Sequence, residues 1–195
     1  MRRTFFLAIM LIPAWLVRGQ DFSVGSFDYT ILSDSQSVSV ISYDGLLCGD
    51  VVIPDSVKNQ GRAYAVAEIS SLGINPGVTT LTIPRTVSSL SRSQFSGLSN
   101  LKAFFVDKEN NWYSAENGLL FKVTLTNKLY DLYCIPEGMT DVKIPEGTVS
   151  TYYDVFSSQS NITRVSIPST FESYIFDKLD SSVELTISEN NPWYK

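Results

Sequence analysis

The sequence predicts a mostly β fold: a solenoid of repeats about 23 residues long, with β-hairpins inserted between the repeats and one hairpin before them. The first observation is an apolar triple at positions i, i+3 and i+5, which occurs in five copies. They are Cys48/Val51/Ile53, Val78/Leu81/Ile83, Leu101/Phe104/Val106, Met139/Val142/Ile144 and Ile162/Val165/Ile167. The interval from the second copy to the third equals that from the fourth to the fifth, at ~23 residues. Because one such unit cannot bury its own apolar side, the units are expected to stack, each strand paired with the next.

Two further positions support the same repeat. Proline follows the last residue of four triples, at Pro54, Pro84, Pro145 and Pro168. It ends a strand because it has no backbone N–H to donate. Apolar residues also recur twelve positions after the triple, at Phe95, Phe156 and Leu179. An ordinary all-β domain, in which Ile-Pro pairs recur by chance, is the alternative, and the strict spacing disfavours it.

The segments before and within the first repeats alternate with a period of two, which is typical of strands. Alternation in Phe27–Ile31 and again in Val38–Val40, on either side of a turn-rich stretch, predicts a hairpin. We expect residues 20–47 to form a β-hairpin cap at the N-terminal end. Asn59, Gln60 and Gly61 predict a second hairpin, inserted near residues 58–70.

A third insertion is predicted between residues 107 and 135. Its turn is Asn117-Gly118, followed by an apolar stretch, and a further turn is expected near Asn127. It separates the two halves of the repeat array, which is expected to run from residue 48 to residue 195.

The first 19 residues have the layout of a secretory signal peptide. Arg2 and Arg3 precede an apolar run from Phe5 to Val17, and the small residue Gly19 follows. A retained membrane anchor is the weaker interpretation, because the run falls short of the ~20 apolar residues that a spanning helix needs. The first cysteine is Cys48, so a lipoprotein anchor has no acceptor. The protein is therefore expected to be secreted, periplasmic or on the cell surface, starting near Gln20.

The charge balance disfavours nucleic acid as a partner. The chain has 15 basic and 20 acidic side chains, a net charge of −5. Removal of residues 1–19 takes away three arginines and no acid, which leaves a net charge of about −8. Binding to phosphate backbones depends mainly on Lys and Arg. A hydrophobic content of 44% argues against disorder.

Three stretches of sequence resemble a known family. They are VVIPDSV at residues 51–57, LTIPRTV at 81–87 and ENNWYSAENGLLF at 109–121. Together they resemble the BspA-like leucine-rich repeats of bacterial surface proteins, and the likeness runs from about residue 22 to the end. The resemblance implies an exported protein that mediates adhesion or recognition of host or neighbouring cells, and it brings no catalytic residues.

The resemblance is incomplete in two places. Turn positions that usually hold Gly, Ala-Phe and Cys here hold residues such as Gln94-Phe95 and Gly97-Leu98. The last copy, Leu185–Ile187 followed by Glu189–Tyr194, reproduces the start of the phrase at 109–113. Two interpretations of this last copy remain: the array is incomplete, or its end pairs with another chain.

Few residues point to catalysis. Histidine is absent, which excludes mechanisms that need an imidazole base or ligand. Cys48 and Cys134 are both expected to be buried. They are also expected to be free thiols, because coils several repeats apart lie too far from one another for a disulfide. Asp107, Glu109 and Glu116 could in principle supply the two carboxylates of a glycosidase. Acidic residues at such positions are more often solvated turn residues, which disfavours this interpretation. We predict no catalytic residue, cofactor or metal.

Four aromatic residues are the candidate binding residues: Trp112, Tyr113, Trp193 and Tyr194. Exposed aromatic side chains give contact area at low entropic cost, which suits a protein or glycan ligand. Trp112 and Trp193 occupy equivalent places in two copies, so a structural role is the alternative. Asn161-Ile162-Thr163 matches a glycan acceptor, but Ile162 is an expected core position, so the match is read as chance.

Two functional hypotheses follow. The first is an exported, non-enzymatic module that recognises a protein or glycan on another cell or in the matrix. The second is a structural component that forms homo-oligomers through an uncapped C-terminal repeat edge. The ligand itself cannot be predicted, because repeat proteins bind through surface side chains that the fold leaves free to vary.

Overall fold

The computed structural model describes residues 20–123, 130–152, 154–156, 160–173, 175 and 179–194. The predicted signal peptide at 1–19 and the predicted turn around Asn127 lie outside these residues. Within the described residues the chain is built of β-strands and a short 3₁₀ helix, without an α-helix, so the prediction of a mostly β fold is confirmed. None of the described helical residues forms a segment long and apolar enough to span a bilayer.

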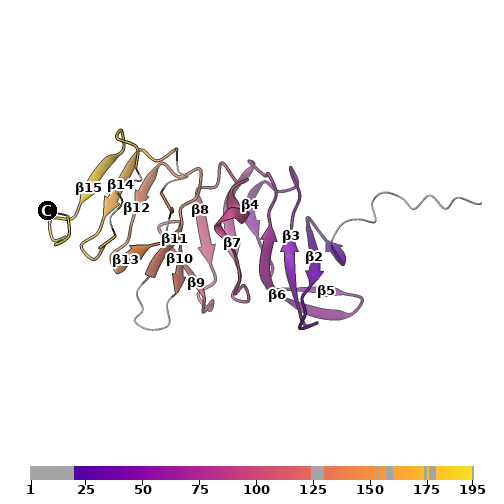
Figure 1. The fold of residues 1–195 in the computed structure, drawn as a ribbon. Coiled ribbons are helices and arrows are strands. Elements are labelled where there is room, and N and C mark those ends of the chain that lie inside the picture. Colours follow the sequence, from indigo (N-terminus) through magenta and orange to yellow (C-terminus); the bar gives the residue numbers. More distant parts are fainter. Residues whose placement is uncertain are drawn as a thin grey trace, which may run out of the picture.

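The strands follow one another along an elongated molecule (Figure 1). They are β1 (Phe22–Val24), β2 (Phe27–Ile31), β3 (Ser37–Ile41), β4 (Gly49–Val52), β5 (Ser56–Asn59), β6 (Arg62–Ser71), β7 (Val78–Ile83), β8 (Ala103–Val106), β9 (Tyr113–Glu116), β10 (Leu119–Val123), β11 (Tyr130–Cys134), β12 (Asp141–Lys143), β13 (Thr148–Thr151), β14 (Arg164–Ile167) and β15 (Glu184–Ile187). The 3₁₀ helix η2 is Arg92–Phe95.

Strands from the apolar triples form two parallel sheets, with strand orders β4-β7-β8 and β12-β14-β15. The middle residue of one triple pairs with the middle residue of the next. Leu81 pairs with Phe104, and Val142 pairs with Val165. Equivalent apolar side chains are therefore stacked on the same side of each sheet.

The stacked side chains form the core. Leu81 and Val165 are both 0% exposed. Phe95 and Phe156, twelve positions after their strands, are each 2% exposed, so they close the core from the other side. Each fully buried side chain of this size contributes about 2 kcal/mol to folding. Burial along the whole stack, rather than any one repeat, thus stabilises the chain.

The N-terminal sheet has the strand order β1-β2-β3-β6-β5. It contains both predicted hairpins: β2 with β3, and β5 with β6. The second hairpin turns at Gln60 (φ 49°) and Gly61 (φ 82°), the left-handed geometry of a two-residue turn. Strand β3 pairs with β6 in parallel, which joins two hairpins that the sequence suggested as separate units.

The third insertion joins the two parallel sheets. Its hairpin, β9 with β10, turns at Asn117 (φ 54°) and Gly118 (φ 79°). The Phe104 N–H donates to the Gly118 carbonyl at 2.9 Å, and the Asn117 side chain donates to the Lys143 carbonyl at 3.0 Å. The turn therefore stands between β8 and β12, where another strand would otherwise be expected.

Candidate binding surface

A buried asparagine holds the loop after β8. The Asn110 amide nitrogen donates to the Pro84 carbonyl at 2.8 Å and to the Val87 carbonyl at 3.0 Å. Its amide oxygen accepts from the backbone N–H of Trp112 at 2.8 Å and of Tyr113 at 2.9 Å. One side chain thus satisfies four backbone groups that would otherwise be buried without partners.

Asn191 makes the same set of bonds after β15. Its nitrogen donates to the Pro168 and Phe171 carbonyls at 2.6 and 3.0 Å. Its oxygen accepts from the N–H of Trp193 and of Tyr194 at 2.8 and 3.2 Å. Sequence reasoning missed both asparagines, although the phrase Asn-x-Trp-Tyr occurs at 110–113 and again at 191–194.

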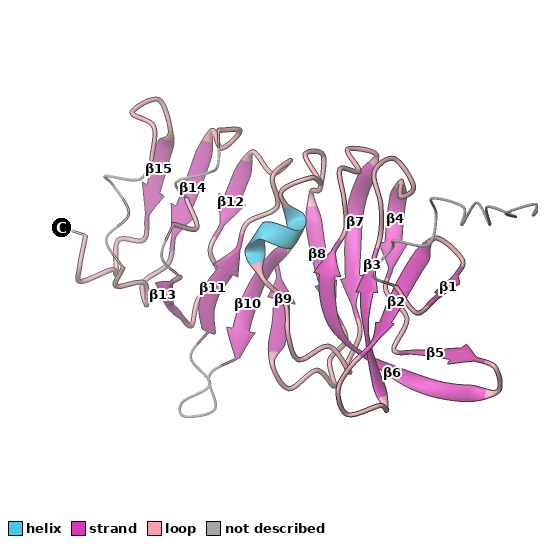
Figure 2. Cartoon of the chain, turned by 45° about the vertical axis from the view of Figure 1, so that its right-hand side comes forward, coloured by secondary structure: helices cyan, strands magenta, loops and turns pink. Residues whose placement is uncertain are grey.

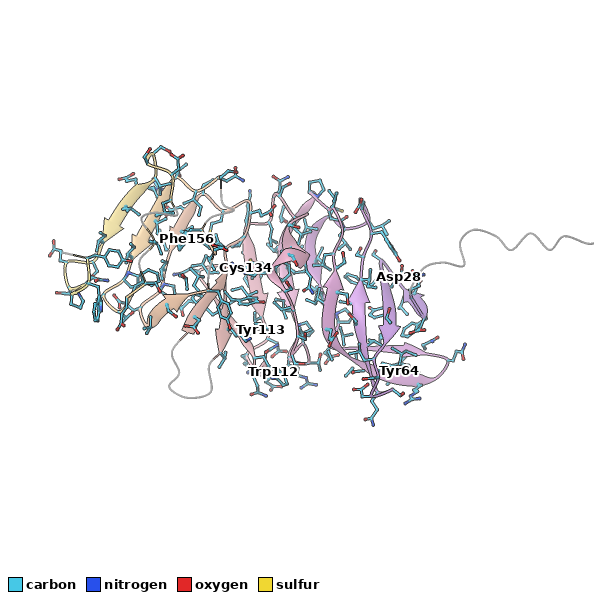
Figure 3. All side chains as sticks on the ribbon, in the orientation of Figure 1. Asp28, Tyr64, Trp112, Tyr113, Cys134 and Phe156 are labelled. Atoms are coloured by element: carbon cyan, nitrogen blue, oxygen red, sulfur yellow. The ribbon has the colours of Figure 1, made fainter. Side chains whose placement is uncertain are left out.

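The loop geometry divides the four predicted binding residues into two pairs. Trp112 and Trp193 are 43% and 61% exposed. Tyr113 is 3% exposed, and its ring lies 5.8 Å from that of Tyr133. Figure 3 shows Trp112 at the lower margin of the molecule and Tyr113 further in. The Tyr113 ring is therefore not available to a ligand at the surface.

Tyr194 also serves the packing of its loop. Its ring stacks on Phe171 at 6.4 Å, and its hydroxyl donates to the Ser173 carbonyl. In both copies the tryptophan presents its ring to solvent while the following tyrosine anchors the loop. Of the four predicted residues, Trp112 and Trp193 are exposed, Tyr194 is partly buried and Tyr113 is buried.

Exposed side chains also line up across the first parallel sheet. Val52 pairs with Thr82, and Thr82 pairs with Phe105. Val52 and Phe105 are 63% and 53% exposed. They point outward because side chains alternate along a strand and their neighbours face the core. We call Val52, Thr82 and Phe105 the outer row.

Ion pairs connect the turns that follow these strands. Arg85 lies 2.9 Å from Glu109 and 3.5 Å from Asp55. The hydrogen bond and charge of Glu109, together with the charge of Asp55, raise the pKa of the exposed Arg85 guanidinium. Asp107 accepts from the Glu109 N–H at 2.9 Å. The carboxylates of Asp55, Asp107 and Glu109 therefore hold these turns together.

The two thiols differ in exposure. Both cysteines are free, as predicted, and Cys134 is buried, but Cys48 is exposed, so its predicted burial was wrong. The cause is a register shift. Gly49, rather than Cys48, pairs with Val78, and Leu47 is the buried residue before the strand. Burial raises the pKa of the Cys134 thiol to about 12.

No group of three or more His, Cys, Asp or Glu side chains in the described part of the chain could hold an ion.

Comparison with known proteins gives matches among solved structures. No family profile and no characterised protein matches the sequence. The similar solved structures are bacterial leucine-rich repeat proteins. A protein from Bacteroides ovatus has a TM-score of 0.48 and 15% identity, with 88% of this chain and 54% of that chain covered. One from Bacteroides capillosus has a TM-score of 0.40 and 16% identity, with 88% and 99% covered. One from T. pallidum has a TM-score of 0.37 and 17% identity, with 87% and 65% covered.

Proposed function

We propose that this protein is an exported, non-enzymatic binding protein of the BspA-like leucine-rich-repeat kind. In this proposal residues 1–19 are a signal peptide, residues 20–47 a hairpin cap and residues 48–195 a solenoid of short repeats with two hairpin insertions. It recognises a protein or glycan on the surface of a host or neighbouring cell. No cofactor or metal takes part.

The outer row is the observation that carries this proposal. Neighbouring strands lie about 4.8 Å apart, so side chains of paired residues form one continuous strip across the sheet. Val52 and Phe105 leave apolar area in water at the two ends of this strip. Exposed aromatic and aliphatic side chains on a rigid sheet suit recognition, because few rotamers are lost when they bind.

Trp112 is a second exposed aromatic side chain, on the loop that follows β8. Its backbone is fixed by Asn110, so its ring is presented by a loop that is already ordered. An ordered loop lowers the entropic cost of binding. A flat indole ring suits the apolar face of a sugar or an aliphatic side chain of a protein.

A binding screen tests the proposal. The chain from residue 20 onward is screened against host proteins, matrix components and glycans, and each hit is measured again with Phe105→Ser and Trp112→Ala. We expect at least one ligand, and about a tenfold loss of affinity for each variant. Ile74→Ser is the matched control, since Ile74 is 64% exposed but lies outside the outer row. A screen without any ligand, or equal losses for all three variants, would contradict the proposal.

Self-association is the second candidate function. β15 is the last strand of its sheet among the described residues, with one edge paired to β14. An unpaired edge can accept a strand from a second copy. This candidate predicts concentration-dependent oligomers in sedimentation, reduced by Thr186→Lys, whereas recognition by a single chain predicts a monomer at all concentrations.

A further inference from the structure

A groove of about 620 Å³ lies between the N-terminal sheet and the first parallel sheet. Four strands contribute to its lining: β1 through Val24, β2 through Phe27 and Tyr29, β4 through residues 50–52 and β5 through residues 56–58. Of these, β1, β4 and β5 stand at the ends of their sheets, whereas β2 lies between β1 and β3. Figure 2 shows β4 with β7 on one side and the N-terminal strands on the other. The groove is therefore bordered by strand edges.

The backbone of β4 has groups free to bond a ligand. Gly49 and Ile53 donate to the Gly77 and Thr82 carbonyls at 2.8 and 3.0 Å, so these N–H groups face β7. The N–H and C=O groups of alternate residues point to opposite sides of a strand. Those of Asp50 and Val52 consequently face away from β7, on the edge that no strand of the described residues pairs with.

Exposed apolar side chains gather at the same place. Val24, Leu46 and Val52 are 44%, 56% and 63% exposed, and all three line the groove. An open strand edge beside exposed apolar side chains is normally covered or blocked in a soluble protein. Its presence here indicates an interaction site.

An exposed lysine at the rim suits one acidic side chain of a partner. Lys58 lines the groove, is exposed, and forms no ion pair with any residue that the structure describes. The Asp50 carboxylate accepts from the hydroxyls of Thr79 and Thr80 at 3.2 and 2.8 Å. Asp50 keeps its negative charge but already accepts two hydrogen bonds, whereas the Lys58 ammonium is a rim charge to which a partner's carboxylate can pair.

We propose that this groove binds an extended segment of another protein, which adds as a strand to the free edge of β4. The segment alternates apolar with polar residues and carries an acidic side chain that meets Lys58. A peptide backbone is the ligand class that supplies alternating donors and acceptors at the spacing of a strand edge. The site shares Val52 with the outer row, but it does not depend on the recognition proposed for that row.

Cys48 provides a native reporter for occupancy. It is exposed and lines the groove, whereas Cys134 is buried with a pKa raised to about 12. Alkylation of the folded protein at neutral pH therefore reports on Cys48, and continued protection of Cys134 reports that the fold is intact.

The probe is an acetylated synthetic peptide with the sequence of residues 181–190, SSVELTISEN, which alternates apolar and polar residues and contains two glutamates. It is expected to slow alkylation of Cys48 at least fivefold, saturably, with a midpoint below about 1 mM. The control peptide carries N-methyl groups at residues 184–187, which removes the backbone donors and keeps the side chains. It is expected not to protect. Equal protection by both peptides, or none by either, would overturn the proposal.

Two variants at one position separate backbone pairing from side-chain contact. Val52→Pro removes an N–H that faces the free edge, and Val52→Thr keeps it. We expect the peptide to bind Val52→Pro at least tenfold more weakly than the parent chain, as measured by protection of Cys48. Its affinity for Val52→Thr is expected to change less than twofold. If Cys134 becomes reactive in Val52→Pro, that variant has lost its fold, and Lys58→Glu is measured in its place. Lys58→Glu is expected to weaken binding of the acidic peptide at least threefold. Unchanged binding in the folded variants would refute strand addition. Concentration-dependent protection of Cys48 without any peptide would instead indicate a second copy in the groove.

Discussion

Asn110 and Asn191 make equivalent hydrogen bonds in two separate repeats, each joining two carbonyls of an earlier turn to two N–H groups of its own loop. The repeat is thus maintained in its buried polar groups as well as in its apolar positions.

Replacing Asn110 should be costly. Asn110→Ala leaves two carbonyls and two N–H groups without their partners, and we expect a loss of about 3 kcal/mol in the free energy of unfolding, measured with urea. Asn111→Ala is the matched control, because Asn111 is exposed. It should change the free energy by less than about 0.5 kcal/mol. Similar losses for the two variants would show that the amide of Asn110 is not essential to the loop.

The close approach at Gly118 should be sensitive to one methyl group. A Cβ at Gly118 would lie 3.1 Å from the Ala103 Cβ and 3.1 Å from the Met139 Cε, at a φ of 79°. Gly147 has a φ of 89°, but a Cβ there would meet no atom within 4 Å. Thermal unfolding should therefore show a larger loss for Gly118→Ala than for Gly147→Ala, by about 1–2 kcal/mol. Equal losses would mean that the two halves of the molecule are not packed closely at this turn.

Stability should fall at alkaline pH through buried tyrosines. Burial raises the pKa of Tyr29 to about 12, above its ordinary value of 10.0. The folded state therefore holds this proton more tightly than the unfolded state. The contribution is complete below pH 10 and is lost as the pH rises toward 12, at up to about 1.4 kcal/mol per pH unit.

Tyr29→Phe isolates this effect. Urea unfolding at pH 8 and at pH 11 should show a smaller decline for Tyr29→Phe than for the parent chain, because the variant has one fewer proton to lose. Tyr43→Phe is the control, since Tyr43 is only partly buried. The same decline in all three proteins would show that Tyr29 does not contribute to the loss of stability at alkaline pH.

The thiols should react in sequence. One equivalent of a maleimide is expected to react with the folded protein at neutral pH, at Cys48, and the second only after denaturation. Peptide mapping by mass spectrometry identifies the labelled residue. Rapid labelling of Cys134 in the folded chain would contradict its burial.

Much of the fold could be predicted because it depends on local patterns. The triple around Leu81 and the turn at Asn117-Gly118 specify their own conformations, by strand alternation and by left-handed turn residues. Features set by a distant partner could not be predicted. Cys48 faces outward because of a register shift against β7, and β3 pairs in parallel with β6, although β4 and β5 come between them in the chain.

The exposure of the candidate binding residues could be predicted only in part, for the same reason. Trp112 and Trp193 were proposed as binding residues because exposed aromatic side chains suit recognition, whereas their repeated place in the sequence favoured a structural role. The inward turn of Tyr113 depends on how Asn110 binds the loop to the preceding turn, which is a contact between separate repeats. The outer row could not be predicted either, because which alternate side chains stay exposed depends on what covers each face of the sheet.

The central claim is that successive repeats lie in register, so that their outward side chains form one face. A cross-link tests it most directly: Thr82→Cys with Phe105→Cys, in a chain that also carries Cys48→Ser. Directly paired residues on neighbouring strands lie within the Cα separation that a disulfide needs, so mild oxidation should give an intramolecular disulfide. The pair Thr82→Cys with Val106→Cys should give none, because Val106 pairs with Ile83 and the two side chains leave opposite faces. Absence of the first disulfide, or equal yields for the two pairs, would contradict the account.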